Sequence, residues 1–380
     1  MASLVQKWRA APADKYVLWI ALMWSAVGVV AVYSAITFLA ETKADSSTEQ
    51  FLLRHVIRLG LALGVAGIFS LIDYKWLARF SRIALLMSLA LLVLVKVLGV
   101  SYGNARRWLE FGGYGFQPSD LAKVALVLYV GVLLTKKQPY IKSLGRAFTP
   151  VFFWILLTVA LIGLEDLSTA FLVLLTVTVM CFVGRVNAAH LAGLFGLCMV
   201  GAIVLLSFSP NRAARIESRL GIKIFSNTES AEVFSKQAEG YQAHQARIAF
   251  ALGGLTGVGP GKSVQRDFLP APYNDFIFAI IAEEYGLLGA VFLLGLFIWF
   301  LFRGFLRIAR HAPDPLGLFL AVGFTTMIVL YGFIHAGVSC GLLPVTGLPM
   351  PMVSYGGTSM VATGIMLGIL LNISRQAGRG

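Results

Sequence analysis

Ten apolar stretches, each about long enough to cross a bilayer as a helix, dominate the sequence. Of the 380 residues, 58% are hydrophobic and 13% are charged, and the mean hydropathy is +0.81. Soluble domains carry roughly a quarter charged residues, so the composition excludes a soluble protein. We predict an all-α polytopic membrane protein with spans at 16–38, 53–72, 80–100, 119–135, 149–164, 168–184, 189–208, 275–303, 315–338 and 355–374.

The basic residues lie mainly between these spans. The N-terminus, the C-tail and alternate loops together hold 16 Lys/Arg, whereas the opposite short loops at 39–50, 165–168 and 339–354 hold one. Cytoplasmic loops are enriched in Lys and Arg, so both termini are predicted to be cytoplasmic. The net charge of +13 therefore reflects topology rather than a nucleic-acid partner. No small-residue cleavage site precedes the further spans, so the first apolar stretch is predicted to be a transmembrane helix rather than a signal peptide.

Two segments on the other side break this charge rule. Residues 101–118 carry Arg106 and Arg107, and residues 209–274 form a large predicted extracytoplasmic loop between spans seven and eight. Connections this long are usually functional or disordered, and helical patterning over 240–252 favours an ordered, functional loop. No repeat or soluble domain is visible, so residues 1–380 are predicted to form a single membrane domain.

Asp275 is the most informative polar residue. It stands in FLPAPYNDFIFAIIAEEYGLLG (268–289), at the entry to the eighth span. A carboxylate in or near hydrocarbon costs on the order of 2–3 kcal/mol unless it faces protein or water. On a helical wheel Asp275 shares a small face with Ala279, Ala282 and Gly286. That face is predicted to look into the bundle or an aqueous cleft.

Two carboxylate pairs accompany Asp275. Glu165 and Asp166 stand in a predicted tight hairpin between spans five and six, and Glu283 and Glu284 lie inside span eight. Glu283 is roughly 12 Å along the helix from Asp275, too far for a shared-proton pair. Structural ion pairs with a neighbouring span are predicted for the glutamates, and Glu284 lies on the opposite face, which argues against a joint role.

The stretch QPSDLAK (117–123) reads as a helix start. Pro118 is predicted in the first turn, with Ser119 or Asp120 as the N-cap. Lys123 follows one turn later on the same face as Asp120. Two interpretations stay open: a local ion pair, or a contact of Lys123, with Arg106 or Arg107, to an anionic lipid headgroup.

Two glycine-rich stretches add candidate anion sites. GGLTGVGPGKS (253–263) lacks the glycine and the preceding strand of a nucleotide P-loop, which leaves a turn with positive φ or a turn that presents Lys262 to an anion. GLLPVTGLPMPMVSYGGTS (341–359) holds three prolines and four glycines and predicts an irregular segment buried in protein. This segment is either a structural plug or a phosphate site with the hydroxyls of Ser354, Thr358 and Ser359. The three cysteines lie in or beside apolar runs and predict neither a metal nor a disulfide.

Five stretches, taken in order, resemble the SEDS family (shape, elongation, division and sporulation), polytopic proteins typified by FtsW and RodA. They are NARRWLEFGGYGFQPSDLAK, LEDLSTA, YQAHQARIAFALGGLTGVGPGKS, FLPAPYNDFIFAIIAEEYGLLG and GLLPVTGLPMPMVSYGGTS. ARRW, GPGKS and the long loop look more like the division branch, FtsW. The usual Glu-Ala-His-Thr reads Ala271-Pro272-Tyr273-Asn274 here, the usual QPSE reads QPSD, and His335 stands near the place of an asparagine. The role of the missing histidine therefore does not carry over.

The resemblance implies a peptidoglycan glycosyltransferase that polymerises lipid II at the outer face of the bacterial cytoplasmic membrane, for septal wall synthesis. The implied partners are a class B penicillin-binding transpeptidase and other divisome or elongasome proteins. Asp275 is the expected base for the acceptor's 4-hydroxyl, with inversion at the anomeric carbon. The expected pyrophosphate contacts are Arg106, Arg107, Lys123 and Lys262. A polyprenyl chain is expected in a groove between spans, beside small-residue faces.

Supporting roles are expected for Asp120, Glu165, Asp166 and Glu283, and the hairpin carboxylates could hold a divalent cation; no other cofactor is expected. Three alternatives remain: a RodA-like elongation polymerase, a flippase for lipid-linked precursor, and a non-catalytic scaffold. Polar clusters at the outer helix ends, without visible inverted halves, favour the enzyme over a transporter.

Overall fold

The computed structural model describes residues 13–42, 48–102, 105–111, 114–207, 229–269 and 271–377. Within these ranges, the side chains of residues 38–42, 101–102, 105–106, 111, 114 and 229–240 fall outside the described part.

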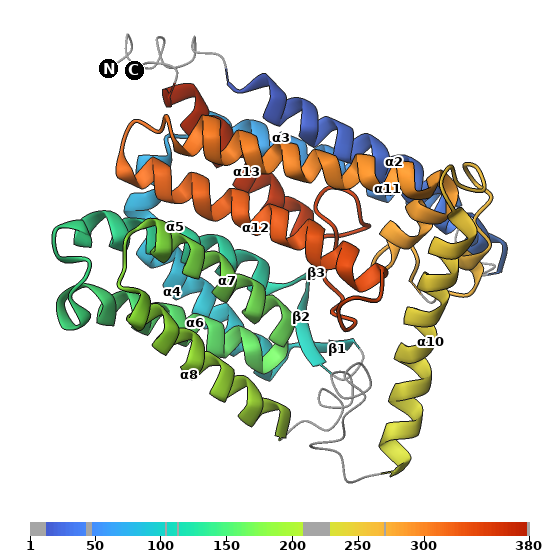
Figure 1. Cartoon of the computed structure of the whole chain (residues 1–380), viewed down its shortest axis with the longest axis horizontal. Helices are drawn as coiled ribbons and strands as arrows, with labels where there is room; N and C mark the ends of the chain where they lie inside the picture. The colour runs from blue at the N-terminus through green and yellow to red at the C-terminus, as the bar shows by residue number, and fades with distance from the viewer. Residues whose placement is uncertain are drawn as a thin grey trace.

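Each predicted span corresponds to one helix (Figure 1). The ten are α2 (Lys15–Thr42), α3 (Thr48–Leu71), α4 (Tyr74–Leu98), α5 (Pro118–Lys137), α6 (Thr149–Glu165), α7 (Leu167–Val183), α8 (Ala188–Ser207), α11 (Ile277–Phe302), α12 (Pro315–Ser339) and α13 (Thr358–Ala377). In the described ranges, nine helices are long and apolar enough to cross a membrane, and α7 is a shorter apolar helix. The prediction of an all-α polytopic membrane protein is confirmed.

The connections lie on two sides of the bundle. The loop side contains residues 99–102, 105–111, 114–117, 166, 254–269, 271–276 and 340–357, and the terminal side contains residues 72–73, 138–148, 184–187 and 303–314. The backbone N–H of Asp14 donates to the hydroxyl of Ser374 at 3.0 Å, so both described ends meet on the terminal side. Short turns of 3₁₀ or π type lie at Gln138–Tyr140, Leu144–Phe148, Gln265–Asp267 and Arg303–Ala309.

Helices α5 and α12 form the centre of the bundle, and α3, α4 and α8 lie at its edge. Most of α5 and α12 is buried, whereas α3 buries a stripe of five residues spaced by three or four. This stripe packs on α13, where a Cβ atom on Gly364 would lie 2.3 Å from the carbonyl oxygen of Ala62. Small residues thus allow the close helix contact that is common inside membranes.

A small antiparallel sheet on the loop side was not predicted. Its strands are β1 (Val100–Tyr102), β2 (Ala105–Phe111) and β3 (Tyr114–Phe116), in the order β1-β2-β3. Gly103-Asn104 and Gly112-Gly113 separate the strands, and two-residue connections rich in glycine and asparagine are typical of hairpins. Strand β2 carries Arg107 toward the hairpin between α6 and α7.

Residues 340–357, here called the Pro/Gly segment, contain no helix and dip into the bundle, as predicted. Leu348, Met350 and Val353 are buried. A Cβ atom on Gly28, near the middle of α2, would lie 2.8 Å from the carbonyl oxygen of Met352. Met352 also has a φ of 60°, which is rare for a residue with a side chain.

Helix α11 is broken at Gly286, and a glycine-rich turn fills the break. Gly286 has φ 66° and ψ −166°. Residues 254–262, here called the Gly turn, replace the missing helical hydrogen bonds: Val258 N–H donates to the carbonyl of Glu283, and Leu287 N–H donates to the carbonyl of Gly254. Gly257 has a φ of 85°, which confirms the prediction of a turn with positive φ.

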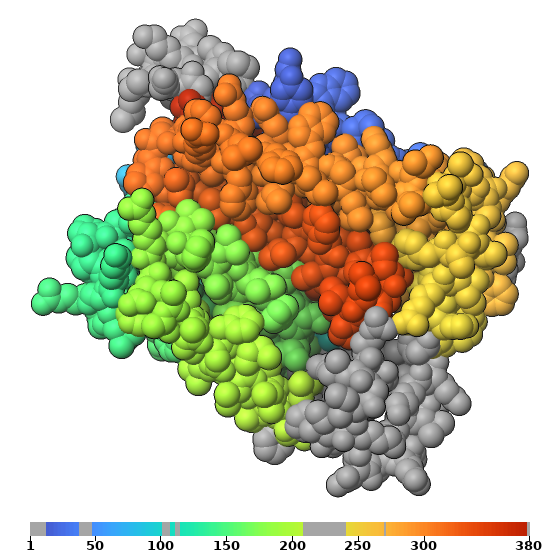
Figure 2. All heavy atoms as spheres, viewed as in Figure 1, coloured from blue at the N-terminus to red at the C-terminus, as the bar shows by residue number. Residues whose placement is uncertain are grey.

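The helical pattern at 240–252 is confirmed as part of α10 (Glu229–Gly253), which packs on the loop-side part of α11 before Gly286. Ala246 and Ala249 of α10 share one apolar cluster with Phe276, Ala279 and Ile280. In Figure 2 the yellow atoms of α10 lie beside the orange-red atoms that follow α12.

Candidate active site

Asp275 lies in a turn directly before α11, which begins at Ile277. The helical wheel had assumed that Asp275 lies inside the helix, so this placement corrects that prediction. In this Asp275 turn (residues 271–276), the N–H groups of Asn274 and Asp275 both donate to the carbonyl of Ala271. The face that continues from it, at Ala279, Ala282 and Gly286, is buried against α10 and the Gly turn. The prediction that this face looks toward protein is confirmed, and Asp275 itself stands at the loop-side entry, half-buried.

The Pro/Gly segment holds the Asp275 turn at two points. The hydroxyl of Ser354 donates to the carbonyl of Asn274 at 2.8 Å and accepts the N–H of Met350 at 2.9 Å. The N–H of Tyr355 donates to the carbonyl of Tyr273 at 2.9 Å. The hydroxyl of Ser354, predicted to contact phosphate, is thus used within the protein, which favours a positioning role.

His335 of α12 anchors the same segment. Its Nδ1 lies 2.8 Å from the carbonyl oxygen of Leu348. Because a carbonyl only accepts, Nδ1 carries the proton in this hydrogen bond. The histidine that stands near the family's asparagine therefore has a defined contact in this fold.

Aromatic rings cover one flank of the Asp275 turn. Tyr273 lies edge-on to Tyr355, with 5.5 Å between ring centroids, and Phe51 of α3 contacts both. Burial raises the pKa of the Tyr273 phenol, and the nearby Tyr355 and the carboxylate of Asp275 raise it further. The phenol is therefore neutral at physiological pH and is a potential hydrogen-bond donor.

Lys123 and Asp120 form a buried ion pair under the Pro/Gly segment. The ammonium of Lys123 lies 2.7 Å from Oδ1 of Asp120 and donates to the phenol oxygen of Tyr331 at 3.0 Å. The hydroxyl of Thr358, at the start of α13, donates to Oδ2 of Asp120 at 2.6 Å. The ion-pair interpretation is confirmed, and Lys123 is only 2% exposed.

The predicted N-cap at this site is wrong. Pro118 does stand in the first turn of α5, but the N-cap is Gln117, and its side chain makes no capping bond. The carboxylate of Asp120 points to Lys123 and Thr358 instead, because both lie within hydrogen-bonding distance.

Arg107 closes the tight hairpin between α6 and α7. Its Nε donates to the carbonyl of Glu165 at 3.0 Å, and Nη1 lies 3.4 Å from the carboxylate of Asp166. Asp166 also caps α7 by accepting the N–H of Thr169 at 3.0 Å. The hairpin is confirmed, and a divalent cation at this hairpin would have to compete with the guanidinium of Arg107 for Asp166.

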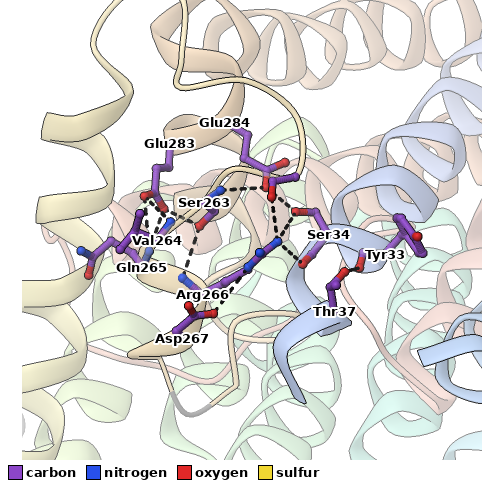
Figure 3. Close-up of polar contacts among 11 residues, drawn as sticks. Tyr33, Ser34, Thr37, Ser263, Val264, Gln265, Arg266, Asp267, Glu283 and Glu284 are labelled. Carbon is purple, nitrogen blue, oxygen red and sulfur yellow. Dashed lines mark hydrogen bonds and ion pairs between the residues drawn. The ribbon is translucent and has the colours of Figure 1, made fainter. Parts of the chain in front are cut away.

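Among the residues that the structure describes, Glu283 and Glu284 do not form the ion pairs that we predicted (Figure 3). Glu283 is fully buried and accepts the N–H of Val264 at 2.9 Å together with the hydroxyl of Ser263. Glu284 accepts the hydroxyl of Ser34 in α2 and, at 3.4 Å, the N–H of Ser263. The two glutamates therefore act jointly on one loop, since residues 263–265 donate hydrogen bonds to both carboxylates.

The loop that these glutamates hold is tied to α2 as well. Nη1 of Arg266 donates to the carbonyl of Ser34 at 3.1 Å and to the carbonyl of Gly261 at the same distance (Figure 3). The chain leading into the Asp275 turn is therefore fixed by α2, α10 and α11.

An apolar groove of about 600 Å³ lies between α6, α7, α8 and residues 343–348. Small residues contribute to its wall, including Gly163, Ala170 and Gly201. Arg107 and Asp166 lie at its loop-side end. The expectation that a polyprenyl chain binds in a groove between spans stays a prediction.

Three further predicted residues remain to be considered. Lys262 is exposed on the Gly turn. Ser359 lines a cavity of about 10 Å³ together with Lys123, Tyr331 and Thr363. The side chain of Arg106 lies outside the described residues. In the part of the chain that the structure describes, no three His, Cys, Asp or Glu side chains converge as metal ligands would.

The sequence pattern of a family described as cell cycle protein, which includes FtsW, RodA and SpoVE, matches residues 14–379. The chain belongs to this family. Within the FtsW/RodA/SpoVE family it is 36% identical to stage V sporulation protein E of Bacillus subtilis, over 96% of this chain and 97% of that protein.

Two further similarities concern a named activity and a solved structure. The chain is 35% identical to a probable peptidoglycan glycosyltransferase FtsW of Geobacter metallireducens, over 96% of this chain and 95% of that protein. Its fold is similar to that of a chain from a peptidoglycan synthase complex that coordinates polymerization and crosslinking. That match has a TM-score of 0.77 and 28% identity, over 97% of this chain and 99% of that chain. The resemblance inferred from the sequence is confirmed.

In this member of the FtsW/RodA/SpoVE family, several residues that contact the predicted site residues were not predicted from the sequence. Tyr331, Tyr355 and Ser263 gave no signal because tyrosine and serine are ordinary at helix ends and in turns. Arg58 in α3 did give one, since a charged residue within an apolar span is rare.

Proposed function

We propose that this protein is a peptidoglycan glycosyltransferase that polymerises lipid II into glycan strands, with Asp275 as the catalytic base. The observation that carries the proposal is the placement of Asp275. It stands at the loop-side entry of α11, on a turn fixed to the Pro/Gly segment, in a chain that matches the family over residues 14–379. Relatives of similar length are named as glycosyltransferases of this kind.

Polymerisation requires a base and a way to stabilise the leaving pyrophosphate. The carboxylate of Asp275 takes the proton from the acceptor sugar's 4-hydroxyl, whose oxygen attacks the anomeric carbon of the donor. The bond from that carbon to the pyrophosphate breaks, so the configuration inverts. Positive charge at Arg107 and Lys262, both on the loop side, stabilises the leaving group.

The remaining candidates have supporting positions in this mechanism. The buried pair of Lys123 and Asp120, with Thr358, holds the start of α13 under the Pro/Gly segment. The apolar groove beside α6, α7 and α8 accommodates part of a polyprenyl chain, and its loop-side end at Arg107 receives the pyrophosphate. These roles follow from geometry and charge.

The cellular setting of the proposal follows from the relatives. One chain of similar fold belongs to a complex of polymerization and crosslinking, which supports a class B penicillin-binding transpeptidase as the partner. Similarity to FtsW proteins supports septal wall synthesis. We place the chain as one membrane domain in the bacterial cytoplasmic membrane, with both termini cytoplasmic and the loop side outside.

The first test compares wild type with Asp275→Asn after reconstitution with the cognate transpeptidase and lipid II. Asparagine keeps the shape of the side chain and removes the base. Loss of a positioned base lowers rates by roughly 10²–10⁴-fold, so the variant is expected to form almost no glycan strands on a gel.

Asp267→Asn is the matched control, because Asp267 is exposed in the same loop and pairs only with Arg266 among the contacts described. It is expected to polymerise like wild type. Equal polymer from Asp275→Asn and wild type would remove Asp275 as the base. No polymer from wild type with its partner bound would remove the glycosyltransferase itself.

A further inference from the structure

Arg58 is a charged residue within a membrane-spanning helix that the proposed mechanism does not use. It lies in α3 about 15 Å from the helix start at Thr48, at 1.5 Å per residue. No described carboxylate forms an ion pair with it. Its guanidinium carbon lies 4.5 Å from the centroid of the Tyr355 ring. Intramembrane arginines are rare and usually mark a ligand path, so we expect an anionic partner for this guanidinium.

His55 stands one turn earlier on the same side of α3. Its side chain is 0% exposed, and its ring stacks on Tyr355 with 5.8 Å between centroids and 21° between planes. Among the described residues, neither Nδ1 nor Nε2 has a hydrogen-bond partner. Buried polar atoms in folded proteins are nearly always hydrogen-bonded, so a donor of this kind points to a group that the described residues do not supply.

Both residues meet the ring that braces the proposed active site. Tyr355 belongs to the Pro/Gly segment, and its N–H holds the carbonyl of Tyr273, two residues before Asp275. Helix α3 lies at the edge of the bundle, and Arg54 and Ile57 on its outward face are exposed. Arg58 lies between the Tyr355 ring and this exposed outward face of α3, and it is half-buried. A lipid from the bilayer can therefore reach its charge.

We propose that Arg58 and His55 bind the phosphate of a membrane lipid between α3 and the Pro/Gly segment. A guanidinium donates two parallel hydrogen bonds to phosphate oxygens, and the neutral imidazole adds one N–H donor. The Tyr355 ring orients the guanidinium by a cation–π contact. Two lipids carry this chemistry: a polyprenyl pyrophosphate, a source that rests on the proposed function, and an anionic phospholipid such as phosphatidylglycerol.

Native mass spectrometry of the full-length protein in detergent micelles tests the site. Undecaprenyl pyrophosphate and phosphatidylglycerol are titrated separately into wild type, Arg58→Gln and Arg54→Gln. A hydrogen bond to a charged group contributes enough that its loss weakens binding by roughly 10-fold or more. Arg58→Gln is expected to show this loss. The matched control Arg54→Gln removes the same charge from an exposed position of α3 and is expected to bind as wild type does.

Comparing the two titrations shows which lipid supplies the bound phosphate. Loss confined to undecaprenyl pyrophosphate identifies the substrate lipid as the ligand, and an equal loss for phosphatidylglycerol identifies a general phospholipid site. Wild-type binding of both lipids by Arg58→Gln overturns the proposal. The readout is binding, so failure of wild type to polymerise lipid II would count against the proposed function and not against this site.

His55→Phe checks the second residue independently of folding. Phenylalanine keeps the ring stacked on Tyr355 and removes two buried nitrogens, so Tm without lipid is expected to stay equal or rise. Binding of the lipid is expected to fall several-fold in the same variant. Unchanged binding together with an unchanged Tm would exclude His55 from the site.

Discussion

At the level of single residues, the buried pair of Lys123 and Asp120 controls how α5, α12 and α13 meet. Each of the two residues is at most 5% exposed, and the contacts to Tyr331 and Thr358 come from two other helices. Burying an ion pair is costly, but removing only one partner leaves an uncompensated charge and costs more. The pair is therefore a strong constraint on the position of the Pro/Gly segment above it.

This constraint predicts a non-additive mutant pair. Asp120→Asn is expected to lower the free energy of unfolding by about 3–5 kcal/mol, because Lys123 loses its counter-charge. The double variant Asp120→Asn/Lys123→Met is expected to recover most of that loss, since no buried charge remains. Thermal unfolding of wild type and both variants in the same detergent measures the two changes in stability. A double variant less stable than the single one would contradict this account of the pair.

At the level of elements, the break in α11 joins the loop-side part of that helix, before Gly286, to the Gly turn and α10. The break needs a residue without Cβ, because Gly286 has φ 66° and a Cβ atom there would lie 2.4 Å from Gly257 N. Four backbone hydrogen bonds between the Gly turn and α11 replace the helical ones. The Asp275 turn is attached to the loop-side part of α11, so the position of the turn depends on these hydrogen bonds.

Gly286→Ala is therefore expected to lower the free energy of unfolding by at least about 1–3 kcal/mol, the cost of a strained backbone, and to lower polymerase activity. Gly295→Ala is the matched control in the same helix, since nothing lies within 4 Å of a Cβ atom there. It is expected to be neutral or to stabilise slightly, because alanine favours helix. Tm and glycan yield of both variants give the comparison, and equal behaviour would mean that the break does not depend on glycine.

At the level of the whole molecule, the fold divides into a loop side that carries the candidate site and a terminal side that carries most basic loops. The two described ends meet through Asp14 and Ser374. Arg303 pairs with Asp14, and Lys75 pairs with Asp314 at 2.9 Å, so the terminal side is closed by ion pairs. Burial opposes ionisation of Asp314, but hydrogen bonds from Gly317, Lys75 and Tyr74 outweigh it and lower its pKa.

The orientation of these sides is testable in intact cells. Lys262→Cys introduces a thiol at an exposed loop-side position, and His311→Cys does the same on the terminal side. A membrane-impermeant maleimide is expected to label the first variant and not the second, because the positive-inside rule predicts that the basic side remains in the cytoplasm. The three native cysteines are buried or half-buried, and the unsubstituted chain gives the background. Labelling of His311→Cys alone would reverse the orientation.

The sequence by itself determined the ten spans, the irregular Pro/Gly segment, the hairpin at Asp166 and the family. These features depend on properties summed over about 20 neighbouring residues or on residues close together in the chain. The small sheet was missed although Gly-Asn and Gly-Gly signals were present. Strands β1 and β3 have only three residues each, and β2 (ARRWLEF) shows no clear alternation of polar and apolar residues.

Only the tertiary structure decided which side chains meet. Thr358 reaches Asp120 across 238 positions and Ser34 reaches Glu284 across 250. Likewise, Ser354 turned out to hold the Asp275 turn, and the glutamates turned out to hold a loop instead of forming ion pairs. Such partners are fixed by helix packing and by the break at Gly286, and packing is a property of pairs of surfaces that no local stretch of sequence contains.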